Sequence, residues 1–428
     1  MKAHNRQLHL WAFLQGIGHY PSGWRYATAT PRAVLDVDYY GHLGQLAERG
    51  RFDAIVFGDQ LHGRDAAGRA PVMLPMPTLD PLTLLAAIAS TTQHIGLVAT
   101  VSTTYNEPQA VADKFATLDL LSKGRAGWNI VTTAHPASPW NFGEQALPPK
   151  TSRYERADEF VTVTKALWDA ARPAALGPNA PVRHAGRWFD MNGALSTPRS
   201  PQVRPVLVQA GQSADGRDFA AKTAEAIFCP APKLEDARAY RDDMRARLPA
   251  FGRDPDGVLI MPGLSFLLAD SEAQAIRKDE ELLDLASPEL CIEYLSETIG
   301  FDLMALNADA PIPLEEILRN CEFPADDVQR VLAPAVAAGE SLRAFARRFT
   351  RTPRGHNIFR GTPEQLADLM QRWLEAGACD GFTLQPAYMP AELELFVDEV
   401  VPLLQRRGIL REAYSGTTLR DHLSQAPG

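Results

Sequence analysis

Polar side chains follow several short apolar runs of the sequence, and these are the residues best placed to do chemistry. They occur at residues 15–19, 58–62, 103–107, 129–133, 209–213 and 385–388. Together they supply carboxamides, hydroxyls and histidines, but few carboxylates. The set is rich in hydrogen-bond donors and acceptors and poor in paired acids and metal ligands.

Three familiar chemistries are disfavoured by what this set lacks. A glycosidase needs two carboxylates across the scissile bond, but only Asp59 ends a strand, and Glu107 lies in a loop. Metal catalysis needs converging ligands, and the ten histidines show neither H-x-H nor H-E-x-x-H spacing, so we expect no metal. A serine nucleophile favours G-x-S-x-G, which the sequence lacks. A dinucleotide loop is begun by Gly16 and Gly18, but Pro21 replaces its third glycine.

One stretch, residues 205–217, has the pattern of an anion site. It runs from an apolar strand through a turn of small residues into a helix. The free N–H groups of a helix N-terminus, together with the Ser213 hydroxyl, favour an anion, and barrels often bind phosphate in their late loops. Ser213 acting only as the helix N-cap is an equally good interpretation at this point. A phosphate-bearing cofactor fits, but the pattern does not name it.

The elements that position these residues alternate strand with helix. Apolar runs predict strands at residues 8–15, 54–59, 95–103, 127–133, 205–210, 226–229, 258–269 and 381–385. Helical spacing predicts helices between and after them, among them residues 38–49, 81–92, 108–122, 154–171, 363–376 and 391–407. This alternation predicts an α/β fold with a parallel sheet, and eight units predict a (β/α)₈ TIM barrel. An open doubly wound sheet is the alternative.

The chain is longer than a barrel requires. It has 428 residues, and a barrel needs about 250. The surplus predicts insertions at residues 134–152, 172–204 and 271–362 of a single TIM-barrel domain that spans residues 1–428. The last insertion is mainly helical, and its acidic stretch at residues 279–284 predicts a solvated helix face.

Composition excludes several partners and compartments. The net charge is −9 with no cluster of Lys and Arg, which argues against binding of nucleic acid. No apolar run approaches the roughly 20 residues that cross a bilayer, and the N-terminal stretch lacks a signal-peptide cleavage site. The four cysteines are widely spaced, which is typical of reduced thiols. We therefore predict a cytoplasmic enzyme that does not bind membranes.

Several longer motifs, taken in order, point to a known family. They are GRAGWNIVTT at residues 124–133, NFG at 141–143, RYERADE at 153–159, QAGQS at 209–213, GTPEQ at 361–365 and GTTLR at 416–420. With these motifs the sequence resembles flavin-dependent monooxygenases of the bacterial-luciferase superfamily, over nearly its whole length. The resemblance is to the branch that contains nitrilotriacetate, dibenzothiophene-sulfone and long-chain-alkane monooxygenases. It implies a TIM barrel with a late insertion that binds FMN, mostly as reduced flavin delivered by a separate NAD(P)H-dependent reductase.

The resemblance also implies roles for individual residues. Asp59 matches a position close to the isoalloxazine ring, and Thr104 and Asn129 match polar positions that hydrogen-bond the flavin. Tyr154 and Ser213 match phosphate contacts. The alternative interpretation is that Asp59 and Thr104 cap helices and that Tyr154 lies at the edge of the core.

Lys150 marks a departure from the family pattern. The family usually places a histidine four residues before this tyrosine as a phosphate ligand, whereas this chain has Lys150. A lysine still offers phosphate a positive point charge. Arg25 and Arg64 are further candidate anion contacts near the mouth of the barrel.

The reaction implied by the resemblance is insertion of one oxygen atom from O₂ into a small organic substrate through a flavin C4a-(hydro)peroxide. His19 and His135, in loops on the catalytic side, are candidates to orient or protonate the oxygenated flavin. Expected partners are a transient flavin reductase and further copies of the chain, in a dimer or tetramer. Two alternatives stay open: a deazaflavin F420-dependent oxidoreductase of the same fold, and a flavin-binding barrel without turnover.

Overall fold

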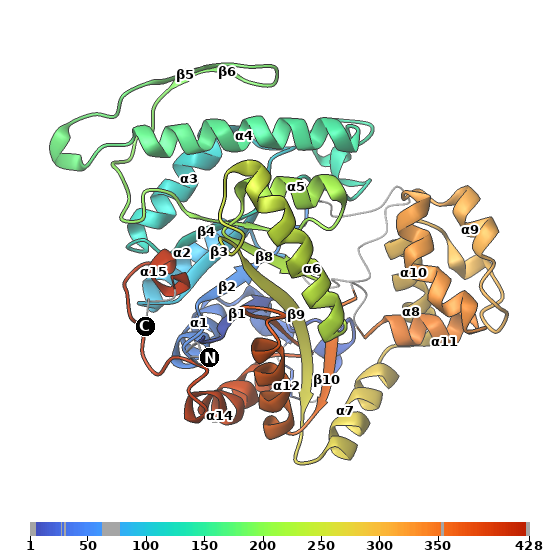
Figure 1. Cartoon of the computed structure of the whole chain (residues 1–428). Helices are drawn as coiled ribbons and strands as arrows, with labels where there is room; N and C mark the ends of the chain where they lie inside the picture. Colours follow the sequence, from blue (N-terminus) through green and yellow to red (C-terminus); the bar gives the residue numbers. More distant parts are fainter. Residues whose placement is uncertain (1–5, 27, 30, 62–77, 352–354, 425–428) are drawn as a thin grey trace.

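Eight parallel strands close into a barrel in the computed structural model, which describes residues 6–26, 28–29, 31–61, 78–351 and 355–424 (Figure 1). The barrel strands are β1 (His9–Leu14), β2 (Ala54–Phe57), β3 (Gly96–Ser102), β4 (Ala126–Val131), β7 (Val206–Gln209), β8 (Ala226–Cys229), β9 (Leu259–Leu268) and β11 (Gly381–Pro386). Neighbouring strands pair in this order, and β11 pairs with β1 to close the ring. The eight predicted strands and the TIM barrel are confirmed, and the open sheet is excluded.

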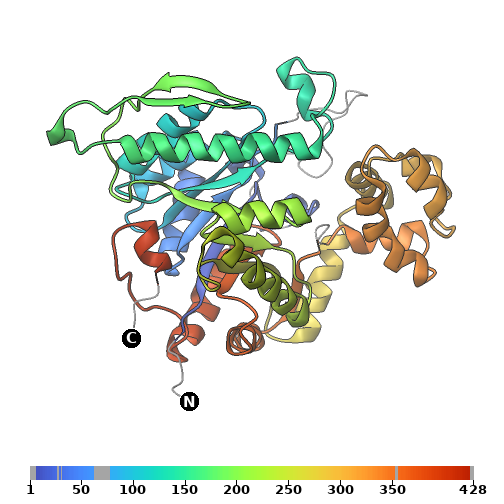
Figure 2. The same cartoon turned by 45° about the horizontal axis from the view of Figure 1, so that its top comes forward.

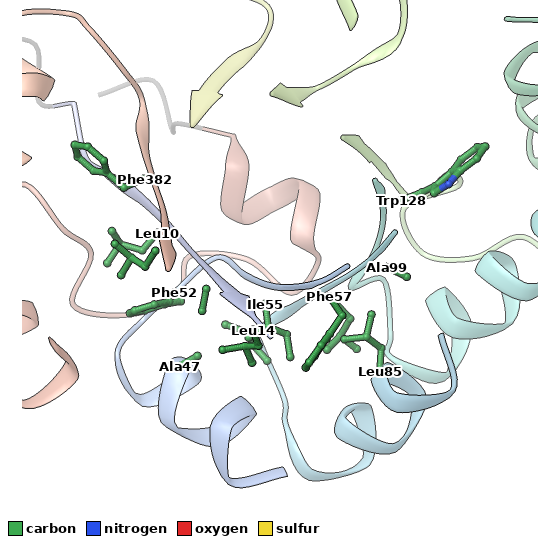
Figure 3. Packing of buried hydrophobic residues seen from close by; sticks show 14 of the residues in the cluster. Leu10, Leu14, Ala47, Phe52, Ile55, Phe57, Leu85, Ala99, Trp128 and Phe382 are labelled. Carbon is green, nitrogen blue, oxygen red and sulfur yellow. The ribbon is translucent and has the colours of Figure 1, made fainter. Parts of the chain in front are cut away.

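The strands are apolar on both faces. Side chains of one face form a cluster inside the barrel, which includes Trp11, Ala54, Val98, Val208 and Met261. The other face packs against the surrounding helices through residues such as Leu10, Ile55 and Trp128 (Figure 3). Burial of both faces explains why these strands appear in the sequence as unbroken apolar runs.

Helices cover the outside of the barrel. They are α1 (Val37–Arg49), α2 (Pro81–Thr91), α3 (Pro108–Leu121), α4 (Lys150–Ala170), α5 (Ala214–Thr223), α6 (Leu234–Arg247), α12 (Pro363–Glu375), α13 (Ala391–Leu395) and α14 (Val401–Arg406). Helix α4 begins four residues before the predicted start, because its first turn is largely solvent-facing and carries no apolar periodicity. The predicted helix at residues 391–407 is interrupted by a π-helical turn, η7 (Phe396–Val400). Short 3₁₀ turns are η1 (Gly23–Arg25), η2 (Pro31–Leu35), η3 (Ser138–Phe142), η4 (Ala174–Leu176), η5 (Leu248–Phe251) and η6 (Leu303–Ala305).

Two of the insertions contain strands that the sequence patterns did not predict. Residues 172–204 form an antiparallel hairpin of β5 (Val182–Ala185) and β6 (Asp190–Gly193), which lies along α4 (Figure 1). Residues 271–362 hold α7 (Glu272–Asp284), α8 (Pro288–Ile299), α9 (Leu314–Asn320), α10 (Ala325–Ala337) and α11 (Leu342–Phe349), and then β10 (Asn357–Gly361). The insertion is mainly helical, as predicted, but it ends in a strand that pairs with β9.

The helical insertion has an apolar cluster of its own and is tied to the barrel. Helices α8 to α11 bury residues such as Leu295 and Leu332, and they project to one side of the barrel in both views (Figures 1 and 2). The prediction of a solvated face is wrong for Asp279, which is fully buried. Its carboxylate accepts hydrogen bonds from Tyr20 (2.7 Å), Arg351 (2.9 Å) and Arg360 (3.0 Å), so the buried charge is paired. Because the hydrogen bond from Tyr20 links the insertion to the barrel, we propose that residues 1–428 form a single domain.

The C-terminal helix closes the end of the barrel at which the strands begin. Leu419 of α15 (Leu419–Leu423) belongs to the cluster inside the barrel. A Cβ at Gly96 or Gly127, both on inward strand positions, would press against the Leu419 side chain. The open end is therefore the one where the strands terminate. Among the helices of the described residues, none is long and apolar enough to span a membrane.

Candidate active site

Polar side chains replace apolar ones toward the carboxyl end of the barrel interior. On β3 the inward face runs from Val98 to Thr100 and Ser102, and on β4 it runs from Gly127 to Asn129. Active sites of TIM barrels lie at this end, in the loops that follow the strands. The polar residues predicted at the strand ends therefore converge on one mouth.

Asn129 has an unused acceptor inside this mouth. Its Nδ2 donates to the Thr100 hydroxyl at 2.9 Å, while Oδ1 is buried without a hydrogen-bond partner. Buried carbonyl oxygens are almost always paired in folded proteins, so an unpaired one at a barrel mouth points to a missing donor. An N–H group of a bound molecule would satisfy it.

Thr104 and the end of β4 are held together by short hydrogen bonds. The Thr104 hydroxyl donates to the Thr132 carbonyl at 2.8 Å, and the hydroxyls of Ser102 and Thr133 are 2.6 Å apart. Thr133 has a left-handed φ of 49°, a conformation that costs a non-glycine residue free energy. Arg153 of α4 donates to the carbonyls of Thr132 and Thr133 and braces this strained turn. The role of Arg153 was not predicted, although it lies in the RYERADE motif.

Asp59 follows β2 and is the one carboxylate that ends a barrel strand among the predicted site residues. Burial, and then the nearby carboxylate of Asp80, raise its pKa to about 6. Asp80 is itself committed to capping α2, where it accepts the Thr83 N–H at 2.7 Å. Asp59 therefore does not serve as this helix cap, and its carboxyl group can change charge near neutral pH.

Tyr154 and Ser213 come together at the start of α5. The Ser213 Oγ accepts the Gly216 N–H at 3.3 Å and caps the helix. A Cβ at Gly216 would lie 2.8 Å from the Tyr154 hydroxyl and 2.9 Å from the Gly211 Cα. The two glycines let the Gly211 turn, the start of α5 and the Tyr154 hydroxyl approach one another closely. The hydroxyls of Tyr154 and Ser213 thus lie beside the positive end of a helix, an arrangement suited to phosphate. We call these four residues the cradle.

Lys150 lies one turn before Tyr154 on α4. It is the first residue of the helix and is exposed, and residues four apart share a helix face. The position suits a mobile positive charge at the edge of the cradle. Of the two arginines proposed as anion contacts, Arg25 is exposed with its guanidinium 4.2 Å from the Trp24 ring centre. Arg64 lies outside the described residues, as does His62.

The two histidines proposed for catalysis lie on different loops. The His19 Nε2 lies 2.8 Å from the Phe13 carbonyl oxygen. A carbonyl oxygen can only accept, so Nε2 carries the proton and donates the hydrogen bond. His135 accepts the Ala137 N–H through Nδ1 at 3.2 Å. Burial lowers the pKa of His135, which leaves its imidazole neutral at pH 7. Its ring also meets Phe323 of the helical insertion at a centroid distance of 6.2 Å.

Comparison of this chain with known proteins identifies its family. Residues 22–380 match the family described as luciferase-like monooxygenase. The chain belongs to this family. It is 40% identical to N-acetyl-S-(2-succino)cysteine monooxygenase of Bacillus subtilis (strain 168), over 99% of this chain and 97% of that protein. It is 37% identical to nitrilotriacetate monooxygenase component A of Aminobacter aminovorans, again over 99% and 97%.

A solved structure agrees with this assignment. DmoA from Hyphomicrobium sulfonivorans matches with a TM-score of 0.85 at 29% identity, over 98% of this chain and 92% of that one. The chain is thus a flavin-dependent luciferase-like monooxygenase, and one of its relatives is named as component A of a monooxygenase.

The residues of this luciferase-like monooxygenase fit a flavin. The cradle offers donors to a phosphate, and the unpaired Asn129 Oδ1 offers an acceptor to a ring N–H. Among the residues that the structure describes, no three His, Cys, Asp or Glu side chains come together to hold a metal ion.

Proposed function

We propose that this chain is the oxygenase component of a two-component system that works with FMN reduced by a separate NAD(P)H:flavin reductase. It would insert one oxygen atom of O₂ into a small organic acid. The cradle carries this proposal, because it joins two hydroxyls, two glycines and a helix N-terminus at a barrel mouth. A flavin that ends in a single phosphate matches such a cradle.

The phosphate contacts follow from the cradle's donors. The Ser213 hydroxyl accepts one hydrogen bond as a helix cap and keeps its proton to donate to a phosphate oxygen. The Tyr154 hydroxyl is a second donor, and Lys150 adds a positive charge one turn away. Charge-assisted hydrogen bonds of this kind are about twice as strong as neutral ones.

The ring contacts follow from β2, β3 and β4. We assign Asn129 Oδ1 as an acceptor for a ring N–H, with Thr104 and Asp59 beside the ring. When bound, reduced flavin supplies two electrons, so that one atom of O₂ enters the substrate and the other leaves as water. Arg153 would keep the Thr133 turn in place while these contacts form.

The two histidines have different proton capacities. His135 is neutral at pH 7 and accepts the Ala137 N–H through Nδ1, so its Nε2 bears the proton. His19 commits its Nε2 proton to the Phe13 carbonyl. We propose both histidines as residues that orient the flavin and substrate at the mouth.

The substrate class is proposed from the relatives. Two of them are named for acids with several carboxylates, N-acetyl-S-(2-succino)cysteine and nitrilotriacetate. We propose a small carboxylic acid for this chain too. Assembly as a dimer or tetramer and a cytoplasmic location stay predictions, and size-exclusion chromatography with light scattering tests the first.

Two measurements test the proposed function. Anaerobic titration should show tighter binding of reduced FMN than of reduced F420, and the reverse order would favour the hydride-transfer alternative. Oxygen uptake with FMN, NADH and a flavin reductase should then rise when a substrate is added from a panel of acids, sulfones, sulfides and alkanes. Tight binding of reduced FMN without substrate-dependent uptake across the panel would favour a barrel without turnover.

A further inference from the structure

Two phenyl rings from strands that are not neighbours meet inside the barrel mouth. Phe13 of β1 and Phe228 of β8 lie on inward positions, two residues beyond Trp11 and Ala226 of the interior cluster. Their ring centres are 5.9 Å apart in an edge-on arrangement. They form an apolar wall that bridges β1 and β8. Its Phe13 end adjoins β2, since a Cβ at Gly58, the residue before Asp59, would lie 3.4 Å from the Phe13 ring.

Strand β10 extends this wall past the end of β8. Strand β8 pairs with β9 as far as Cys229 opposite Pro262, and β10 pairs with β9 from Asn357 opposite Leu264 onward. The residue before Asn357 is His356, which this register places opposite Gly263. Residues opposite each other in paired strands face the same side, and Gly263 lies two positions beyond the inward-facing Met261. His356 therefore points into the barrel.

The side chains confirm this direction. A Cβ at Gly263 would overlap the His356 ring, lying 2.8 Å from its Cγ and 2.9 Å from its Cε1. The imidazole thus occupies the space that Gly263 leaves free. It also stacks on Phe228 with ring centres 4.9 Å apart and planes 19° apart. The Asn357 side chain fixes the start of β10 by donating to the Pro232 carbonyl at 2.7 Å.

His19 stands at the other end of the same wall. Its ring meets Phe13 edge-on at 5.0 Å, so ring contacts run from His19 through Phe13 and Phe228 to His356. The wall has an apolar centre and an imidazole at each end. The inward positions of the two neighbouring strands, Ser265 of β9 and Gln385 of β11, are polar and uncharged.

We propose that His356 contacts the substrate and donates a hydrogen bond to one of its carboxylates, while the substrate's carbon chain lies on Phe13 and Phe228. This inference rests on the proposed function, since it names a recognition group for that same site. It also gives the helical insertion a purpose, because residues 271–362 end by carrying His356 into the mouth.

A pair of substitutions separates recognition from packing. His356→Phe keeps a ring on Phe228 but removes both nitrogens, and His356→Gln keeps a hydrogen-bond donor but loses the ring. The matched control is His94→Phe, because His94 also stacks on an aromatic ring, Tyr414, at 4.8 Å and 16°. Nitrilotriacetate and N-acetyl-S-(2-succino)cysteine serve as probes, with binding to FMN-loaded protein followed by calorimetry and KM by oxygen uptake.

We expect His356→Phe to weaken binding of the better probe about 10- to 100-fold, as loss of a hydrogen bond to a charged group does. His356→Gln should lose less than 10-fold, and the His94 control should match wild type. Reduced-FMN affinity should stay within twofold in all three variants. A purely structural His356 predicts the reverse order, with His356→Phe near wild type and His356→Gln impaired, and that result would overturn the proposal.

The proposal and the proposed function can fail separately. If the wild type binds neither acid but oxidises a neutral sulfone or sulfide, the role of His356 falls and the monooxygenase proposal stands. If reduced FMN does not bind, the proposed function falls. In that case the two acids are tested without flavin. Weaker binding of either acid by His356→Phe than by wild type would uphold the recognition role of His356, and equal binding by the two proteins would overturn it.

Discussion

Replacing Ser213 by alanine separates two roles that one hydroxyl plays at the start of α5. Its oxygen accepts the Gly216 N–H at 3.3 Å, which caps the helix, and its proton is left to donate to a phosphate. Loss of the cap should lower the free energy of unfolding by about 1 kcal/mol. Loss of a hydrogen bond to a charged phosphate should cost about 1.5–3 kcal/mol of binding, which is about a 10- to 150-fold rise in Kd for reduced FMN.

Helix α7 supplies the matched control. Its N-cap Ser271 accepts the Gln274 N–H at the same 3.3 Å, with no part in the cradle. Ser271→Ala should lose as much stability as Ser213→Ala but bind reduced FMN like wild type. Ser213→Thr keeps the hydroxyl and should recover most of the affinity.

The assay is anaerobic titration of each variant with photoreduced FMN, beside urea unfolding of the same preparations. The cradle assignment predicts a large affinity loss for Ser213→Ala alone. If Ser213→Ala loses stability like the α7 variant but keeps a Kd within twofold of wild type, Ser213 is a helix cap only, and the phosphate site is wrongly placed.

Three further substitutions test Asp59, Asn129 and the tie between Tyr20 and Asp279. Asp59 has a folded pKa of about 6, above its unfolded value of 3.8, so its contribution to stability is fully present below pH 3.8 and is lost as pH rises through 6. In urea unfolding, Asp59→Asn should therefore be more stable than wild type by about 1–2 kcal/mol at pH 8, a figure reduced for the solvent around this half-buried group. The two proteins should be equally stable near pH 3.5. Equal stability at pH 8 would contradict the raised pKa. Asn129→Leu should raise the Kd for reduced FMN about 5- to 30-fold by removing an acceptor, and an unchanged Kd in the same titration would remove Asn129 from the ring contacts. Tyr20→Phe should lower stability by about 1–2 kcal/mol, because it takes one of three donors from the buried Asp279, and no change in urea unfolding would show that this tie is dispensable.

Local patterns in the sequence predict the barrel well, for a physical reason. Strands buried on both faces must be apolar throughout, and each is followed by a helix with its own spacing, so neither signal depends on distant partners. Ser213 was found in the same way, since capping chemistry is local. The meeting of Tyr154 with Ser213 depends on tertiary packing, and only the resemblance indicated it.

The features that were missed depend on partners far along the chain. Strand β10 is only partly buried over most of its length and has just two apolar residues, Ile358 and Phe359, between polar ones. It forms because β9 offers an unpaired edge past the end of β8. His356 could therefore not be placed from its neighbours in sequence. Asp279 looks like part of a solvated acidic face until Arg351 and Arg360 pair with it. A conserved spacing between a strand glycine and a distant histidine would have been the signal to look for.

Isotope labelling tests whether the chain inserts oxygen from O₂ into its substrate. The purified chain, a flavin reductase, NADH and FMN are supplied with ¹⁸O₂ and the acid that gives the largest oxygen uptake, and the product is analysed by mass spectrometry. We expect one ¹⁸O atom in each product molecule, formed only when FMN and the reductase are both present. Product oxygen derived from water, or product formed without reduced flavin, would contradict it.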